Sequence, residues 1–107
     1  MKRGDVVTIA LNSDYGKPRP AVIIQNMLFA DHPSFTVLPM TSDIRETPLF
    51  RMTILPNNEN GLRAVSQVMI DKAQTVSVDR LGPVIGSLLD SEMLAISRAL
   101  SVFLGIA

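Results

Sequence analysis

Cysteine and tryptophan are absent from this sequence of 107 residues, and histidine occurs once, at His32. Without cysteine there is no disulfide, no thiolate nucleophile and no cysteine-type zinc site. A lone histidine cannot build a histidine cluster, and Asp31-His32-Pro33 is a turn pattern typical of a surface loop. The acidic pair Asp43 and Glu46 is followed by no third ligand at a known metal spacing. We therefore expect no metal centre and no cofactor.

The charge balance argues against one class of partner. Ten basic and ten acidic residues give a net charge of zero. Proteins that bind long duplexes without sequence preference usually carry a basic excess, so this balance argues against such a role. It leaves room for a short local site, where two or three positioned cations hold a few nucleotides.

Long apolar runs and a secretion signal are also missing. No apolar run approaches the ~18 residues that a membrane span needs. The N-terminal residues 1–5 contain two bases but no small-residue cleavage site, so we expect no signal peptide. The hydrophobic fraction of 47% is typical of a folded core. We predict a soluble cytoplasmic protein without membrane contact, in which residues 1–107 form one domain.

The first two thirds of the chain have the pattern of β structure. Short segments rich in β-branched residues alternate with clusters of Pro, Gly, Asn and Asp every ~10 to 15 residues. The predicted strands are residues 5–11, 21–26, 35–40, 50–55, 66–71 and 74–76. Residues 21–24 are apolar without a break, which predicts a strand covered on both faces.

The last third has the period of a helix. A turn is expected at Gly82-Pro83 and Gly86, after which Asp90 or Ser91 can cap the helix. Its apolar positions are Met93, Ile96, Leu100, Phe103 and Leu104. Gly105 follows as a C-terminal cap. We predict that this helix lies against the sheet and that its other apolar residues pack on a second subunit. The predicted fold is mainly β with a C-terminal helix.

Arg19 stands between two prolines at the start of an apolar strand, in Lys17-Pro18-Arg19-Pro20-Ala21. Proline fixes its own φ and favours extended backbone in the residue before it, so Pro18 and Pro20 restrict the direction of Arg19. A guanidinium is always charged, and its planar fork matches a phosphate. Arg19 is therefore a candidate phosphate contact. The alternative is a rigid loop whose arginine pairs with a carboxylate or lies in water.

Two hydroxyl residues, Thr41 and Ser42, follow the third predicted strand. They are candidates to donate to a phosphate oxygen, and the alternative is an ST-turn that starts the next loop. Neither has the glycine-flanked elbow or the histidine partner of a hydrolase nucleophile. Asp71, followed by Lys72, is either one half of a structural salt bridge or an acceptor that orients a substrate base or Arg19.

Several motifs occur in order over nearly the whole chain: RGDVV, GKPRPAVIIQN, LPMTS, NGLRAVSQVMIDKAQTV and a closing amphipathic helix. In this arrangement the sequence resembles the MazF/PemK toxins of prokaryotic toxin-antitoxin systems. The resemblance implies a small, strongly curved SH3-like β-barrel of the CcdB/PemK/MazF type with attached helices. It also implies a sequence-selective, metal-independent endoribonuclease, an mRNA interferase, that acts on single-stranded RNA as a homodimer. A cognate antitoxin would silence the enzyme by covering the RNA groove.

By motif, the resemblance places the family's catalytic arginine at Arg19 and its strand-end threonine at Thr41. Ser42 and Asp71 become substrate-binding residues, and Asp71 either accepts a proton or reads a base edge. The nucleophile is then the 2'-hydroxyl of the RNA, and cleavage leaves 2',3'-cyclic phosphate ends. Chemically, Arg19 is suited to stabilise the extra negative charge on phosphorus.

The first loop departs from the family pattern. Many relatives carry a Glu or His in a longer loop, whereas residues 12–17 here offer Asp14, Tyr15 and Lys17. Tyr15 is a candidate to stack on a base, and Lys17 is a candidate substrate contact. The general base is therefore left open, and so is the RNA sequence that is cut.

A second resemblance provides an alternative function. Residues 42–48, followed by Arg51-Met52, are similar to the CcdB gyrase poisons, which share the fold, and so is the C-terminal Gly105-Ile106. The gyrase contact of those proteins uses a tryptophan just before that glycine, where this chain has Leu104. A third alternative is a catalytically inactive member that binds only its antitoxin or an operator complex.

Overall fold

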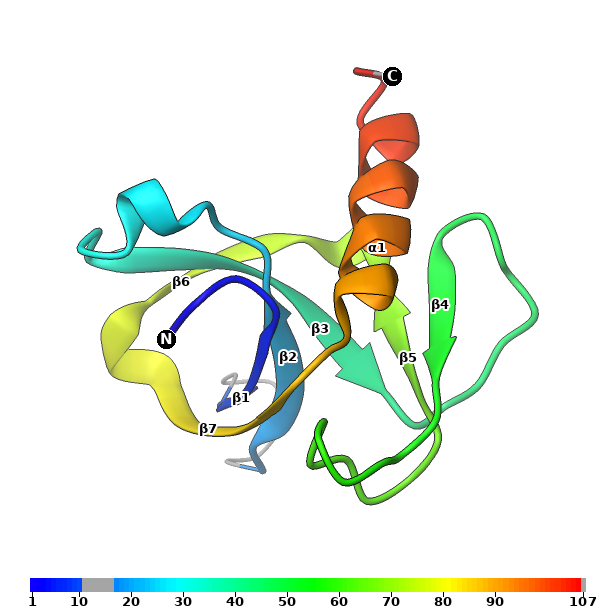
Figure 1. Cartoon of the computed structure of the whole chain (residues 1–107), viewed down its shortest axis with the longest axis horizontal. Helices are drawn as coiled ribbons and strands as arrows, with labels where there is room; N and C mark the ends of the chain where they lie inside the picture. The colour runs from blue at the N-terminus through cyan, green and yellow to red at the C-terminus, as the bar shows by residue number, and fades with distance from the viewer. Residues whose placement is uncertain (11–16, 107) are drawn as a thin grey trace.

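The computed structural model describes residues 1–10 and 17–106. In this part of the chain seven strands curl into one sheet, and a helix stands on it (Figure 1). With η marking short 3₁₀ turns, the elements are β1 (Asp5–Ile9), β2 (Arg19–Ile23), η2 (Met27–Phe29), β3 (Ser34–Thr41), β4 (Arg51–Ile54), β5 (Ser66–Met69), η3 (Ile70–Lys72), β6 (Gln74–Ser77), η4 (Val78–Arg80), β7 (Leu81–Ser87) and α1 (Asp90–Phe103). The prediction of a mainly β fold with a C-terminal helix is confirmed.

The strand order is β4-β5-β3-β2-β1-β7, all antiparallel, with β6 paired to the first half of β3. β3 curves the sheet because it pairs with three neighbours in turn, residues 34–37 with β6, 37–39 with β2 and 40–41 with β5. The expected barrel is not closed, since no ladder joins β4 to β7 within the described residues. Instead the segment between β4 and β5 reaches β7, where Ser87 N donates to Glu59 O at 2.8 Å.

β7 corrects the sequence prediction, because a strand occupies the place of the turn expected at Gly82-Pro83 and Gly86. β7 pairs with β1, and register shifts on either side of Val7 accommodate its irregular backbone. A Cβ at Gly82 would lie 2.0 Å from Thr8 Oγ1, and one at Gly86 would lie 2.3 Å from the carbonyl carbon of Asn60. These glycines allow close approach of neighbouring segments and do not reverse the chain.

The core has one layer on each face of the sheet. The first cluster contains Val6, Val22, Leu38, Met40, Ile54, Val68, Ile70, Leu88 and Ile96, and the second contains Val7, Ile9, Ala21, Ile23, Phe35, Val37 and Val76. Successive residues of β2 therefore enter different clusters, as the alternation of a strand requires. This confirms the prediction that the apolar run at residues 21–24 is covered on both faces. Each fully buried Val, Leu, Ile, Phe or Met side chain contributes roughly 1.5–3 kcal/mol to the stability of the folded state.

The first turn of α1 is capped by Glu92, whose Oε1 accepts from Leu89 N at 2.8 Å. The sequence suggested Asp90 or Ser91 for this role, but the N-cap position falls on Leu89. A carboxylate in the first turn is also favourable for the helix dipole. The helix therefore begins at Asp90, slightly before the predicted start, and has a different capping side chain.

α1 lies against the first cluster through Ile96, which is fully buried. The helix ends at Phe103, and Gly105 just beyond it has φ of +75°, as expected for a glycine that terminates a helix, while Ile106 N donates to Ser101 O at 2.9 Å. Figure 1 shows the outer turns projecting away from the sheet, which leaves Phe103 and Leu104 exposed. Within residues 1–10 and 17–106, no helix combines the length and apolar character that a bilayer crossing requires.

Candidate active site

The start of β2 and the end of β3 are neighbours in the sheet. Their antiparallel register pairs Ala21 with Pro39. Continued by two residues along each strand, this register sets Arg19 opposite Thr41, and opposite residues share one face of a sheet. Strand pairing therefore brings the two residues that the sequence selected for phosphate chemistry to the same end of the sheet.

A cavity of about 530 Å³ opens at this point. One wall of the cavity is formed by Pro18, Arg19 and Pro20. The end of β3 contributes Thr41 and Ser42 to the lining. Residues 61–64, which lie between β4 and β5, form another wall. This volume is in the range of small-ligand sites and exceeds what one phosphate group fills.

The charge of the cavity differs from that of the whole chain. Two guanidinium groups line it, those of Arg19 and Arg63, and none of the lining residues in the described ranges is acidic. The hydroxyl residues that line it are Thr8, Thr41, Ser42 and Ser66. In a protein of zero net charge, this arrangement concentrates positive charge at one place. Such a cavity favours an anion with several oxygens, and a phosphodiester fits that description.

Thr41 combines the two roles that the sequence offered as alternatives. Its Oγ1 accepts from Asp43 N at 3.1 Å, which is the ST-turn, and the residue also lines the cavity. A hydroxyl has one donor and two acceptor positions. The turn occupies one acceptor position and leaves the hydroxyl hydrogen to donate to a substrate oxygen.

Asp71 lies apart from the cavity. It belongs to η3, and its Oδ1 is 3.8 Å from Nε of Arg51, with side chains that are 24% and 11% exposed respectively. The structure therefore pairs this carboxylate with Arg51, a partner that the sequence did not suggest. Because both side chains are largely buried, solvent and salt screen their charges less than they screen a surface pair.

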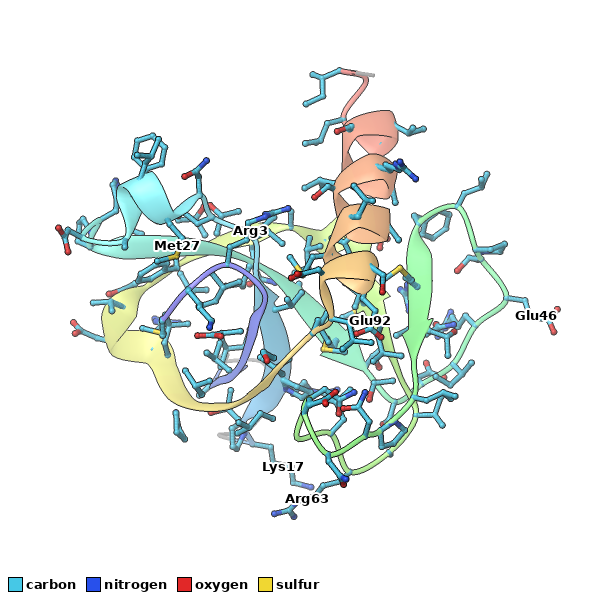
Figure 2. The ribbon with its side chains drawn as sticks, in the orientation of Figure 1. Arg3, Lys17, Met27, Glu46, Arg63 and Glu92 are labelled. Carbon is cyan, nitrogen blue, oxygen red and sulfur yellow. The ribbon has the colours of Figure 1, made fainter. Side chains whose placement is uncertain are left out.

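The remaining predicted residues belong to the first loop. Lys17 is exposed and directly precedes the proline wall of the cavity. Figure 2 shows its side chain at the same edge of the molecule as that of Arg63. Tyr15 and Asp14 lie outside the described residues.

Arg63 is the charged residue in the described lining of the cavity that the sequence analysis missed, and the hydroxyl residues Thr8 and Ser66 were missed as well. Arg63 follows Asn60-Gly61, a dipeptide typical of a turn, and this was the only local signal. The spacing of residues along the chain does not indicate that this loop reaches β2, because the contact depends on how the sheet curves.

Together these features define a class of small proteins that are built on a curved antiparallel sheet and have a cavity lined by two arginines. A family model described as the PemK-like, MazF-like toxin of type II toxin-antitoxin systems matches residues 2–104. The chain belongs to this family.

Known relatives agree in sequence and in fold. The probable endoribonuclease MazF of Mycolicibacterium smegmatis is 45% identical over an alignment of 108 positions that covers 100% of this chain and 99% of that protein. The structure of Mycobacterium tuberculosis toxin MazF-mt6 has a TM-score of 0.81 at 28% identity, over 96% of this chain and 98% of the other. A mycobacterial endoribonuclease in complex with its cognate antitoxin has a TM-score of 0.81 at 24% identity, over 100% and 97% of the two chains. This last likeness is one of fold.

Proposed function

We propose that this chain is the toxin of a type II toxin-antitoxin system and a sequence-selective endoribonuclease that cleaves single-stranded RNA without a metal ion. Membership of the toxin family supports the first part, and the 45% identical relative, named a probable endoribonuclease, supports the second. The observation that carries the proposal is the cavity that Arg19 and Thr41 share.

In the proposed reaction the 2'-oxygen of the RNA attacks the adjacent phosphorus, and the bond from phosphorus to the 5'-oxygen breaks. The 2'-hydroxyl loses a proton and the leaving oxygen gains one, which yields a 2',3'-cyclic phosphate and a 5'-hydroxyl. Negative charge builds up on the non-bridging oxygens in the transition state. Arg19, restricted by Pro18 and Pro20, presents a fixed positive fork to these oxygens.

The hydroxyl residues complete the phosphate site. Thr41 donates its hydrogen to the scissile phosphate or to the 2'-oxygen, and Ser42 lies next to it at the end of β3. Among the described residues no histidine or carboxylate lines the cavity. We therefore assign the rate enhancement mainly to stabilisation of charge, which is commonly the largest single contribution in such sites.

Other residues contribute to binding in this proposal. Lys17, beside the proline wall, contacts the RNA backbone. The substrate-binding roles of Asp71 and Tyr15 stay predictions from the sequence. For Asp71 such a role requires RNA to extend beyond the cavity to the Arg51 pair.

The proposed partners are an antitoxin and a second copy of the chain. An antitoxin segment that enters the cavity would compete with RNA for the two arginines. The apolar end of α1 supports a dimer, because Val102, Phe103 and Leu104 are between 49% and 68% exposed. We propose the cytoplasm as the place of action, because messenger RNA is translated there.

The test is a digest of a long single-stranded transcript in the presence of a chelator, followed by analysis of the new ends. We expect discrete fragments with 2',3'-cyclic phosphate ends. Arg19→Ala should lower kcat/KM by ~10²–10³, the usual cost of removing one donor to a developing charge. Arg98→Ala is the control, because Arg98 is an exposed residue of α1 that does not line the cavity.

Two results would contradict the proposal. One is an intact transcript after prolonged digestion by the wild-type protein, and trapping of gyrase on DNA would then favour the poison alternative. The other is equal activity of the Arg19→Ala and Arg98→Ala variants.

A further inference from the structure

The loop between β4 and β5 is organised by one buried amide. Asn60 is 0% exposed, and its Oδ1 accepts from Asn57 N at 3.2 Å and from Leu62 N at 3.0 Å. Its Nδ2 donates to Leu55 O at 2.9 Å. Three hydrogen bonds from one buried side chain give this loop a single conformation.

The same loop is seated against β7. Gly61 has φ of +69°, and a Cβ there would lie 2.0 Å from Ile85 O. Ser87 N donates to Glu59 O at 2.8 Å on the other side of the turn. The loop is therefore fixed to the sheet as well as within itself, so the residues that follow it have a defined position.

Arg63 comes two residues after Gly61 and lines the cavity. It is exposed, and it makes no hydrogen bond or ion pair with any residue in the described ranges. Figure 2 shows its side chain extending at the edge of the molecule, as that of Lys17 does. The loop thus places a cation at the cavity that has no partner among residues 1–10 and 17–106.

We propose that Arg63 binds the phosphate next to the scissile one. This inference rests on the proposed function, in which Arg19 and Thr41 hold the scissile phosphate. One phosphodiester fills only part of a cavity of about 530 Å³. Arg63 belongs to a different wall from Arg19. The two guanidiniums therefore serve successive phosphates of one strand, and Arg63 fixes the register of the RNA.

Kinetics distinguish this role from that of Arg19. The charge of a neighbouring phosphate does not change during the reaction, so its contact is equally strong in the ground state and in the transition state. Loss of such a contact raises KM and leaves kcat unchanged. Loss of the contact to the scissile phosphate lowers kcat.

The experiment compares Arg63→Ala, Arg63→Lys and the control Arg98→Ala on a short RNA that contains one mapped cleavage site. For Arg63→Ala we expect KM to rise about tenfold, the effect of one charge-assisted hydrogen bond, with kcat within about twofold. Arg63→Lys should recover part of the loss, because a lysine retains the charge but not the fork. Circular dichroism checks that each variant is folded.

A second measurement locates the phosphate. Substrates with a single neutral methylphosphonate at each linkage near the cleaved bond remove one charge at a time. We expect one position adjacent to the cleaved bond at which the wild-type protein loses about as much as Arg63→Ala does, and at which Arg63→Ala loses nothing more.

The outcomes separate the two proposals. If the wild-type protein leaves the RNA intact, both are overturned. If it cleaves but Arg63→Ala has an unchanged KM, only the role of Arg63 is overturned. A fall in kcat without a rise in KM, or additive losses at every methylphosphonate position, also overturns it.

Discussion

At the scale of single residues, the position of Thr41 depends on two neighbours. The pairing of β2 with β3 places it on the same cavity as Arg19, and its hydroxyl oxygen accepts a hydrogen bond from Asp43 N. One acceptor position is committed to the backbone N–H of Asp43, which leaves the hydroxyl hydrogen available to a substrate oxygen. Preorganisation of this kind lowers the cost of binding the transition state.

Replacement of Thr41 by valine tests this role, because the side chain keeps its shape and loses its hydroxyl. We expect kcat to fall by ~10² through the lost donor. We also expect the free energy of unfolding to fall by about 1 kcal/mol, because Asp43 N loses its acceptor. Thr41→Ser is the matched control and should retain most of both quantities. Single-turnover cleavage and urea unfolding measure them. Full activity in Thr41→Val would show that the hydroxyl takes no part in the reaction.

Arg51 and Asp71 form an ion pair whose partners the sequence did not indicate. Its atoms are 3.8 Å apart and its side chains are 11% and 24% exposed. The sequence marked Asp71 as an acid beside a cation, but in the fold the cation comes from β4. Two segments that are separate in the chain are joined by this pair at the edge of the sheet.

At the scale of elements, the loop between β4 and β5 contacts β7, the strand with which β4 would have to pair in a closed barrel. Its contacts with β7 use glycines on both sides, Gly61 in the loop and Gly86 in the strand. Any side chain at either position would push the loop away from the sheet. The same loop forms a wall of the cavity, so one element both contacts β7 and lines the candidate site.

Gly61 and Gly105 have nearly equal φ angles but different surroundings. Substitutions at these two positions therefore distinguish the cost of backbone strain from the cost of a steric clash. Gly61 has φ of +69° and a would-be Cβ 2.0 Å from Ile85 O, whereas Gly105 has φ of +75° and nothing within 4 Å. Gly105→Ala should cost ~1–2 kcal/mol of unfolding free energy, the usual cost of left-handed backbone. Gly61→Ala should cost at least ~2 kcal/mol more, through overpacking against β7. Urea unfolding of both variants measures the difference, and equal losses would mean that the loop moves freely.

At the scale of the whole molecule, a chain with no net charge carries a cavity with two arginines and no acid among its described lining residues. The attraction for RNA is therefore local. Because the chain has no net positive charge, we expect long duplexes to gain little from it.

Salt dependence tests this picture. With a 2'-O-methyl RNA that cannot be cleaved, the logarithm of the binding constant should fall with the logarithm of salt concentration. For single strands the slope is about −0.7 for each neutralised phosphate, so contacts from Arg19, Arg63 and Lys17 predict about −2 for each cavity. Fluorescence anisotropy over a range of salt measures it. A slope steeper than about −4 would indicate an extended basic surface, contrary to this prediction.

Most elements were predictable because their signals are local. The strands that become β1 to β6 were predicted from apolar alternation and turn residues, with ends that differ by a few residues. The helix was predicted from its period and from Gly105. β7 was not predicted, because Gly82, Pro83 and Gly86 are turn residues by any local rule. The close approach of Thr8 and Asn60 gives these glycines a different use, and that approach exists only in the folded sheet.

The candidate site was predictable in part, for the same reason. Arg19 was identified because two prolines flank it, and Thr41 because it follows a strand. Arg63 has no such signal beyond a nearby turn.

The sequence by itself determined the strands from β1 to β6, the helix, the arginine between two prolines and the family to which the chain belongs, because each depends on neighbours along the chain. Only the tertiary structure decided which residues share the cavity, because the register of β2 on β3 and the seating of one loop on β7 join distant segments. Chain order constrains such contacts weakly, whereas close packing and hydrogen bonding across the curved sheet specify them.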